Sequence, residues 1–241
     1  MLIIFDVDGT LIGGEPADWL AFDQAIESVL GYSVDEAFFL GLPEITAQSI
    51  AEAAVRASGA PCGNGLEERI RDEYFRGLRL AHDSDPLTFQ SRSGVRELLQ
   101  DLTTMPGIQV ALATGDWHPT ISFKLAAAGI DISSFPLATS SDTPRRPDII
   151  RLAAARAGLL SRAVYVGDGV WDLRACRELK IDFIGTGEKG HRLRESGIEQ
   201  FLEPLETEAF LGILQTLGLT KFHGRPTGLA EADGRTCGQE E

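Results

Sequence analysis

The chain has 241 residues, a hydrophobic fraction of 43% and a mean hydropathy of −0.03, which suit one large globular domain or a core with an insertion. Its formal net charge of −14 argues against nucleic-acid binding, because phosphate backbones attract basic faces. No apolar run approaches the ~18 residues that a membrane span needs, so we expect no membrane association.

The first predicted element is a buried strand. The apolar run from Leu2 to Phe5 is too short for a helix and is typical of a strand. Asp6 and Asp8 follow it, and Gly9 permits a sharp exit of the chain. Open α/β sheets hold their sites just beyond the carboxyl ends of such strands. A polar turn that merely closes the strand is the simpler alternative.

Residues 13–88 are predicted to be all-helical. Apolar residues at helical spacing predict helices over 17–30, 44–58 and 66–81, with a further short segment over 32–40. Clusters of Gly and Pro separate them. The block starts directly after the first strand and its acids, so we expect a helical domain inserted there to cover them as a cap.

Residues 89–220 alternate between the two kinds of element. Strands are predicted over 108–113, 135–138, 163–166 and 181–184, with an edge strand over 199–202. Helices are predicted over 93–104, 119–128, 147–157, 170–179, 191–196 and 206–217. This alternation predicts an α/β core, built from residues 1–12 and 89–220, with helices on both faces of a parallel sheet. Residues 221–241 lack periodicity and are expected to be disordered.

The cysteines and the first residues of the chain predict the cellular compartment. Cys62, Cys176 and Cys237 are few, odd in number and without metal-type spacing, which favours a reduced compartment. No basic and apolar leader opens the chain. We therefore expect a cytoplasmic protein.

Polar residues follow three of the predicted strands. They are Asp6-Val7-Asp8, then Thr114-Gly115-Asp116, then the segment Gly-Asp-Gly-Val-Trp-Asp at 167–172. Taken alone, Thr114-Gly115 is an ordinary strand-end turn, and Asp168 and Asp172 suit caps of the following helix. Their joint occurrence after parallel strands favours one shared site.

These segments carry a family resemblance. The chain has Asp-x-Asp-Gly-Thr-Leu at 6–11, a Thr after an apolar strand at 114, and Gly-Asp-x-x-x-Asp at 167–172. It thereby resembles the phosphatases of the haloacid dehalogenase superfamily that have an α-helical (C1-type) cap, phosphoglycolate-phosphatase-like proteins among them. The resemblance implies a Rossmann-like, three-layer parallel-sheet core with an inserted all-helical cap.

The carboxylates suit a magnesium site. Mg²⁺ prefers oxygen ligands, and a divalent cation overcomes the repulsion between an anionic nucleophile and a phosphate ester. Asp6 and Asp168 are the candidate carboxylate ligands, and the resemblance adds the backbone carbonyl of Asp8. Asp172, one helical turn beyond Asp168, is expected to orient ligands or metal-bound water.

The resemblance also implies the catalytic roles. Asp6 would be the nucleophile that forms an aspartyl-phosphate. Asp8 would protonate the leaving group and later activate water. Thr114 and the amide of Gly115 would hold the phosphoryl oxygens. The expected partner is a small phosphorylated metabolite.

One motif departs from the family pattern. The family usually has a Lys ahead of the helix that precedes its last motif, but this chain has Arg146-Pro147 there. Arg keeps the charge and contacts phosphate bidentately, with a different reach. Lys124, in the helix after Thr114, is the second candidate. We expect at least one of the two to neutralise the phosphate, with a slight preference for Lys124.

Two alternatives to a phosphatase stay open. A phosphomutase of the β-phosphoglucomutase type would share Asp6 and Asp8, and the missing Lys is compatible with a catalytically weak phospholigand-binding or regulatory protein. Residues 13–87 contain no Lys, which disfavours chemistry that needs a Schiff base in the cap. Trp19 and Phe22 are expected in the cap core. Candidates to contact the leaving group are Glu44, Thr46, Gln48, Arg76, Arg79 and His82.

Overall fold

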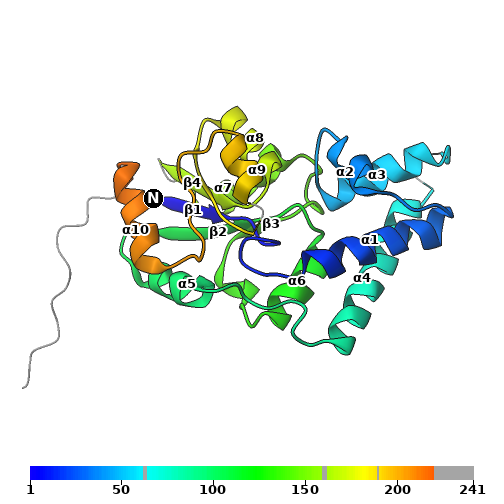
Figure 1. Ribbon diagram of the computed structural model, residues 1–241, viewed down its shortest axis with the longest axis horizontal. Helices are drawn as coiled ribbons and strands as arrows, with labels where there is room; N and C mark the ends of the chain where they lie inside the picture. The colour runs from blue at the N-terminus through cyan, green and yellow to red at the C-terminus, as the bar shows by residue number, and fades with distance from the viewer. Residues whose placement is uncertain (62–63, 159–161, 189, 220–241) are drawn as a thin grey trace, which may run out of the picture.

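A five-stranded parallel sheet forms the middle layer of the larger part of the protein, with helices on both of its faces (Figure 1). The structure is a computed structural model that describes residues 1–61, 64–158, 162–188 and 190–219. The strands are β1 (Leu2–Phe5), β2 (Gln109–Ala113), β3 (Leu137–Ala138), β4 (Ala163–Gly167) and β5 (Asp182–Gly185). Their order is β3-β2-β1-β4-β5, so the first strand of the chain is the middle one. This position explains its continuous apolar run, because a central parallel strand is buried on both faces.

Helices cover both faces of the sheet, which confirms the predicted three-layer core. Side chains alternate along a strand, so Ile3 and Phe5 join the apolar core on one face and Leu2 and Ile4 join the core on the other. The first face is covered by α5 (Val95–Thr104), α6 (His118–Ala127) and α10 (Thr207–Thr216), and the second by α7 (Arg146–Arg156) and α8 (Val170–Leu179). Two short helices are η1 (Ile132–Ser134) and α9 (Gly190–Glu195).

The remaining helices gather beyond the carboxyl ends of the strands (Figure 1). They are α1 (Glu15–Leu30), α2 (Glu36–Leu40), α3 (Ala47–Ala57) and α4 (Leu66–Ser84). They bury an apolar cluster of their own, to which Phe22, Ile50 and Tyr74 contribute. Trp117, at the start of α6, also joins that cluster. We call these four helices and their connections the cap. The domain bounds 13–88 stay a prediction.

Several predicted elements differ in extent from the observed ones, among them the strand expected over 135–138, which spans only Leu137–Ala138. The expected edge strand over 199–202 is only an isolated parallel bridge between Phe201 and Gly185. Pairing stops there because β5 ends at Gly185, and Pro204 soon follows with no N–H to donate. The helix expected from residue 44 begins instead at Ala47. Thr46 caps it by accepting a hydrogen bond from the backbone N–H of Ser49.

Some predictions fall on other parts of the chain. The expected disordered tail, Cys62 and Cys237 lie outside the described residues. Cys176 is a free thiol and is buried. Among the described residues, none of the helices combines the length and the apolar character that crossing a membrane requires.

Candidate active site

Three loops that follow neighbouring strands begin at the same edge of the sheet. Phe5, the last residue of β1, pairs in register with Leu112 of β2 and Val166 of β4. Because the strands are parallel and in step, the chain leaves all three at the same level. The predicted polar positions 6, 114 and 168 are therefore brought together.

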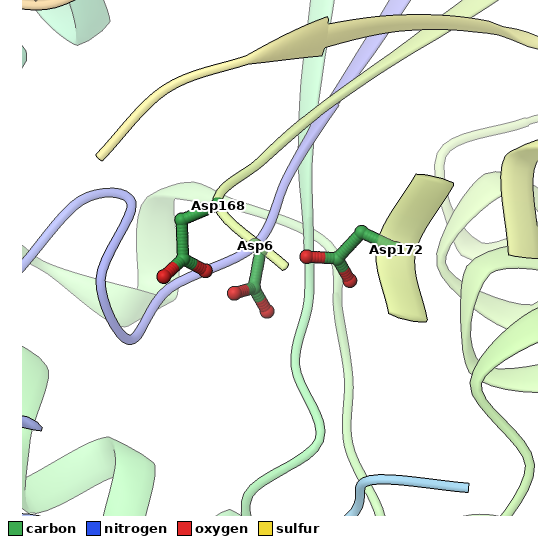
Figure 2. A group of neighbouring side chains, drawn as sticks. All are labelled: Asp6, Asp168 and Asp172. Carbon is green, nitrogen blue, oxygen red and sulfur yellow. The ribbon is translucent and has the colours of Figure 1, made fainter. Parts of the chain in front are cut away.

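Three carboxylates meet at this edge (Figure 2). One oxygen from each of Asp6, Asp168 and Asp172 lies within 4.8 Å of the others, and Asp6 lies between the other two. Asp6 is 3% exposed and Asp172 is fully buried. Gly9 makes room for Asp168, since a Cβ at Gly9 would overlap that carboxylate, and its φ of +76° favours glycine.

Arg146 lies against this carboxylate cluster. Its Nη1 donates to Oδ1 of Asp6 at 3.2 Å and to Oδ1 of Asp172 at 2.8 Å. Asp172 also accepts hydrogen bonds from the Tyr165 hydroxyl and the backbone N–H of Gly169, at 3.3 and 3.1 Å. Asp172 thus fixes the guanidinium directly beside Asp6, a contact that the sequence analysis did not foresee.

The cap also fixes Arg146. Its Nη2 donates to the backbone carbonyl of Ile45 at 3.0 Å, and its backbone N–H donates to Glu44 Oε2 at 3.2 Å. The Thr46 hydroxyl donates to the carbonyl of Pro144 at 2.8 Å. A Cβ at Gly115 would overlap Nη2 of Arg146, so glycine there permits this close approach.

Lys124 lies at a second group of carboxylates. Its Nζ is 2.7 Å from Asp8, 2.7 Å from Asp18 of α1 and 2.9 Å from Asp116. The lysine is fully buried, and the Tyr74 hydroxyl donates to the same Asp18 oxygen at 2.5 Å. The ammonium therefore joins Asp8 to the cap and is enclosed by its partners. We call Asp8, Asp18 and Asp116 the lysine-bound carboxylates.

Asp18 and Asp116 are site residues that sequence reasoning missed. Thr120 and Lys124 lie one turn apart on one side of α6. Asp116 comes four residues before Thr120, just ahead of the helix, and accepts a hydrogen bond from the Thr120 hydroxyl at 2.7 Å. That spacing was a readable signal for Asp116. No such spacing marked Asp18, because an acidic residue in a helix is normally expected to be exposed and only the packing of the cap brings Asp18 to Lys124.

Burial and crowding change the acidity of the site carboxyls. Burial raises the pKa of Asp6 well above its usual range, and Asp172 adds to the rise while Arg146 opposes it. Burial raises the pKa of Asp8 to about 7, against the opposing effect of Lys124. Burial raises the pKa of Asp168 as well, with Asp172 as the next cause. The cluster around Asp6 therefore lacks positive charge.

Replacement of Lys124 by methionine is expected to lower the free energy of unfolding by about 3–5 kcal/mol, because three largely buried carboxylates would lose their common cation. Lys180→Met is the matched control, since Lys180 is exposed. Urea unfolding followed by circular dichroism measures both variants. A loss of ~1 kcal/mol or less in Lys124→Met would contradict the ion-pair role.

A cleft with a cavity volume of about 90 Å³ is lined by Asp6 and by all three lysine-bound carboxylates. Drug-sized ligands need cavities of roughly 300–1,000 Å³, so this one suits a small ligand. Thr114 and Gly115 line it, and their expected contact with a phosphate stays a prediction. Its other lining residues are Asp6, Asp8, Asp18, Trp19, Phe22, Ile45, Thr46, Ala47, Ile50, Tyr74, Asp116, Arg146 and Trp171.

The predicted cap residues divide into two groups. Thr46 lines the cleft, Glu44 contacts Arg146, and Gln48 accepts a hydrogen bond from the Trp117 ring at 3.0 Å. The others lie away from the cleft lining: Arg76 pairs with Glu73, Arg79 stacks on Phe75 and His82 stacks on Phe89. Trp19 and Phe22 belong to the cap's apolar cluster, as expected, but they also line the cleft.

Comparisons with known proteins agree with this architecture. A family model described as haloacid dehalogenase-like hydrolase matches residues 1–180. No curated protein matches the chain.

Several solved structures share the fold. A hydrolase from Pseudomonas syringae is 22% identical, with a TM-score of 0.70 over 89% of this chain and 98% of its own. CbbY from Rhodobacter sphaeroides, solved in complex with phosphate, is 21% identical, with a TM-score of 0.68 over 86% and 97%. β-Phosphoglucomutase from Clostridium difficile is 16% identical, with a TM-score of 0.71 over 91% and 99%. At these identities the likeness concerns the fold.

Proposed function

The chain belongs to the haloacid dehalogenase-like hydrolases, and on that premise we propose that it is a Mg²⁺-dependent phosphatase acting on a small phosphate monoester. One observation carries the proposal: Asp6, Asp168 and Asp172 crowd together, and Arg146 is the only described cation in an ion pair with any of them. The three carboxylates carry more negative charge than one guanidinium neutralises, so the site suits a divalent cation. The guanidinium can also contact a phosphate.

The donor set fits Mg²⁺. The cluster consists of carboxylates, the hard oxygen ligands that this ion prefers, and it includes no thiol or imidazole among the described residues. Asp6, Asp168 and the backbone carbonyl of Asp8 would hold the ion. Asp172 is already engaged by Arg146, Tyr165 and Gly169. When bound, the ion neutralises phosphate charge so that an anionic carboxylate can approach.

The two cations receive different roles. Arg146 lines the cleft beside Asp6, where a guanidinium can contact two phosphoryl oxygens at once. Lys124 is enclosed by carboxylates and lies 2.7 Å from Asp8, so we assign it to hold Asp8 in position. This reverses the slight preference for Lys124 as the phosphate contact that the sequence alone gave.

The reaction then follows in two steps. A carboxylate oxygen of Asp6 attacks phosphorus, and the bond from phosphorus to the ester oxygen breaks as Asp8 gives that oxygen a proton. The alcohol leaves and Asp6 carries the phosphoryl group. Water then attacks phosphorus while Asp8 takes its proton, which frees phosphate and restores Asp6. The pKa of Asp8, about 7, lets one carboxyl serve as acid and then as base near neutral pH.

Metal removal tests the proposal. Phosphate release from p-nitrophenyl phosphate and from a panel of small phosphate esters is expected to fall to background in EDTA and to return with added Mg²⁺, because the crowded carboxylates need the cation to meet an anionic substrate.

The Asp6→Asn variant supplies the background. No metal-dependent release above that variant across the panel would sink the proposal and favour a phospholigand-binding protein. Conversion of a hexose phosphate into its isomer, without free phosphate, would instead favour a phosphomutase.

A further inference from the structure

We propose that the leaving alcohol of the substrate carries a positive charge, as in a phosphate ester of a short amino alcohol. The inference deepens the proposed phosphatase function and rests on it. It comes from the charges and rings that line the cleft on the Asp8 side, away from Asp6 and Arg146.

The first step is to identify which side of the cleft meets the leaving group. Phosphorus must lie at Asp6, and the ester oxygen must lie within reach of Asp8, which protonates it. Asp18 and Asp116 bind the same ammonium as Asp8 and line the same cleft. The lysine-bound carboxylates therefore surround the place where the leaving group lies.

The second step is the charge of that place. Three carboxylates share one ammonium, and Lys124 has no exposed surface with which to contact a ligand. Oδ1 of Asp18 accepts from both Lys124 and Tyr74, whereas its Oδ2 accepts from no described residue. Arg146 is the only cation among the described residues that line the cleft, and it belongs to the phosphate side. Even when Asp8 carries the proton that it gives to the ester oxygen, Asp18 and Asp116 together carry one negative charge more than the ammonium balances. A carboxylate or second phosphate on the leaving group would therefore be repelled.

The third step concerns the aromatic residues that line the cleft. Trp19 is half-buried and lines the cleft with the rings of Phe22 and Tyr74, and the Tyr74 hydroxyl contacts Asp18. Aromatic faces attract ammonium groups within about 6 Å and stabilise them by roughly 0.5–2 kcal/mol. Such walls repel an anion, because carboxylates and the faces of aromatic rings are both negative. Carboxylates beside aromatic rings form a surface that suits a small organic cation.

Three matched esters test the inference: 2-aminoethyl phosphate, ethyl phosphate and 2-phosphoglycolate, which differ mainly in the charge of a two-carbon leaving group. With Mg²⁺ present, kcat/KM is expected to fall in that order, with 2-aminoethyl phosphate at least about tenfold above 2-phosphoglycolate. Equal values, or a preference for ethyl phosphate or 2-phosphoglycolate, would overturn the inference while leaving phosphatase function intact. Turnover of none of them, nor of p-nitrophenyl phosphate, above Asp6→Asn would overturn both.

Two variants test whether the preference for a cationic leaving group arises in the cleft. Asp18→Asn removes one negative charge from the leaving-group side and keeps an acceptor for Lys124 and Tyr74, so the ratio of the amine ester to the carboxylate ester is expected to fall severalfold. Asp72→Asn, on the exposed side of α4, should leave the ratio unchanged. A ratio is measured within one protein, so partial unfolding of a variant does not alter it. An unchanged ratio in Asp18→Asn would contradict the assignment.

Discussion

Replacement of Asp6 by asparagine is expected to reduce kcat/KM for p-nitrophenyl phosphate by on the order of 10⁴- to 10⁶-fold, the size of effect typical when one residue of a catalytic group is removed. Asparagine has nearly the same shape but lacks the anionic oxygen that would attack phosphorus. The change also removes one of the crowded carboxylates that would hold Mg²⁺. Initial rates at saturating Mg²⁺ measure the effect.

Two controls exclude a general effect of the substitution and a loss of folding. Asp72→Asn makes the same chemical change at an exposed ion pair and should keep the parental rate. Circular dichroism should show that both variants are folded. A residual rate in Asp6→Asn above ~10⁻² of the parental value would rule out Asp6 as nucleophile and point to direct attack by water.

Replacement of Asp8 by asparagine is expected to lower steady-state turnover of alkyl phosphates by roughly 10²- to 10⁴-fold, because general acid–base catalysis is lost in both steps. An aryl phosphate should behave differently. p-Nitrophenolate leaves without a proton, so the first step survives and only hydrolysis of the aspartyl-phosphate slows. Stopped-flow absorbance should then show a burst of p-nitrophenol equal in amount to the enzyme, followed by a slow phase.

The burst assay separates Asp8 from a residue that merely supports the fold. Mass spectrometry of acid-quenched Asp8→Asn protein is expected to find the phosphoryl group on the peptide that contains Asp6. Asp72→Asn should show neither burst nor phosphorylated peptide. Uniform loss of all phases, with an unphosphorylated protein, would count against Asp8 as the acid and base of the proposed mechanism.

Local patterns were sufficient for the core. The strand at Leu2–Phe5 and the helix at Val170–Leu179 have the predicted bounds, because apolar runs and helix-start residues act over a few positions. Parallel strands end at one edge, so the convergence of Asp6 and Asp168 followed from their places in the chain. The site assignments built on them remain proposals.

Local patterns could not predict which carboxylates contact Arg146 and Lys124. Arg146 meets Asp6 140 positions away, and Lys124 meets Asp18 106 positions away. Both cations were candidates for the phosphate because each lies near a motif and each has the right charge. Packing of the core brings Asp8 and Asp116 to Lys124, and docking of the cap adds Asp18.

Local residue patterns were enough to predict the α/β sheet, the helical cap and the carboxylates at the strand ends, because periodicity and strand order are encoded locally. Long-range packing was needed to place Arg146 at Asp6, to bring Asp18 to Lys124 and to add cap residues to the cleft. Those contacts join segments whose approach depends on the whole packed core. The sequence lists every charged residue, but the fold determines which of them face each other in the cleft.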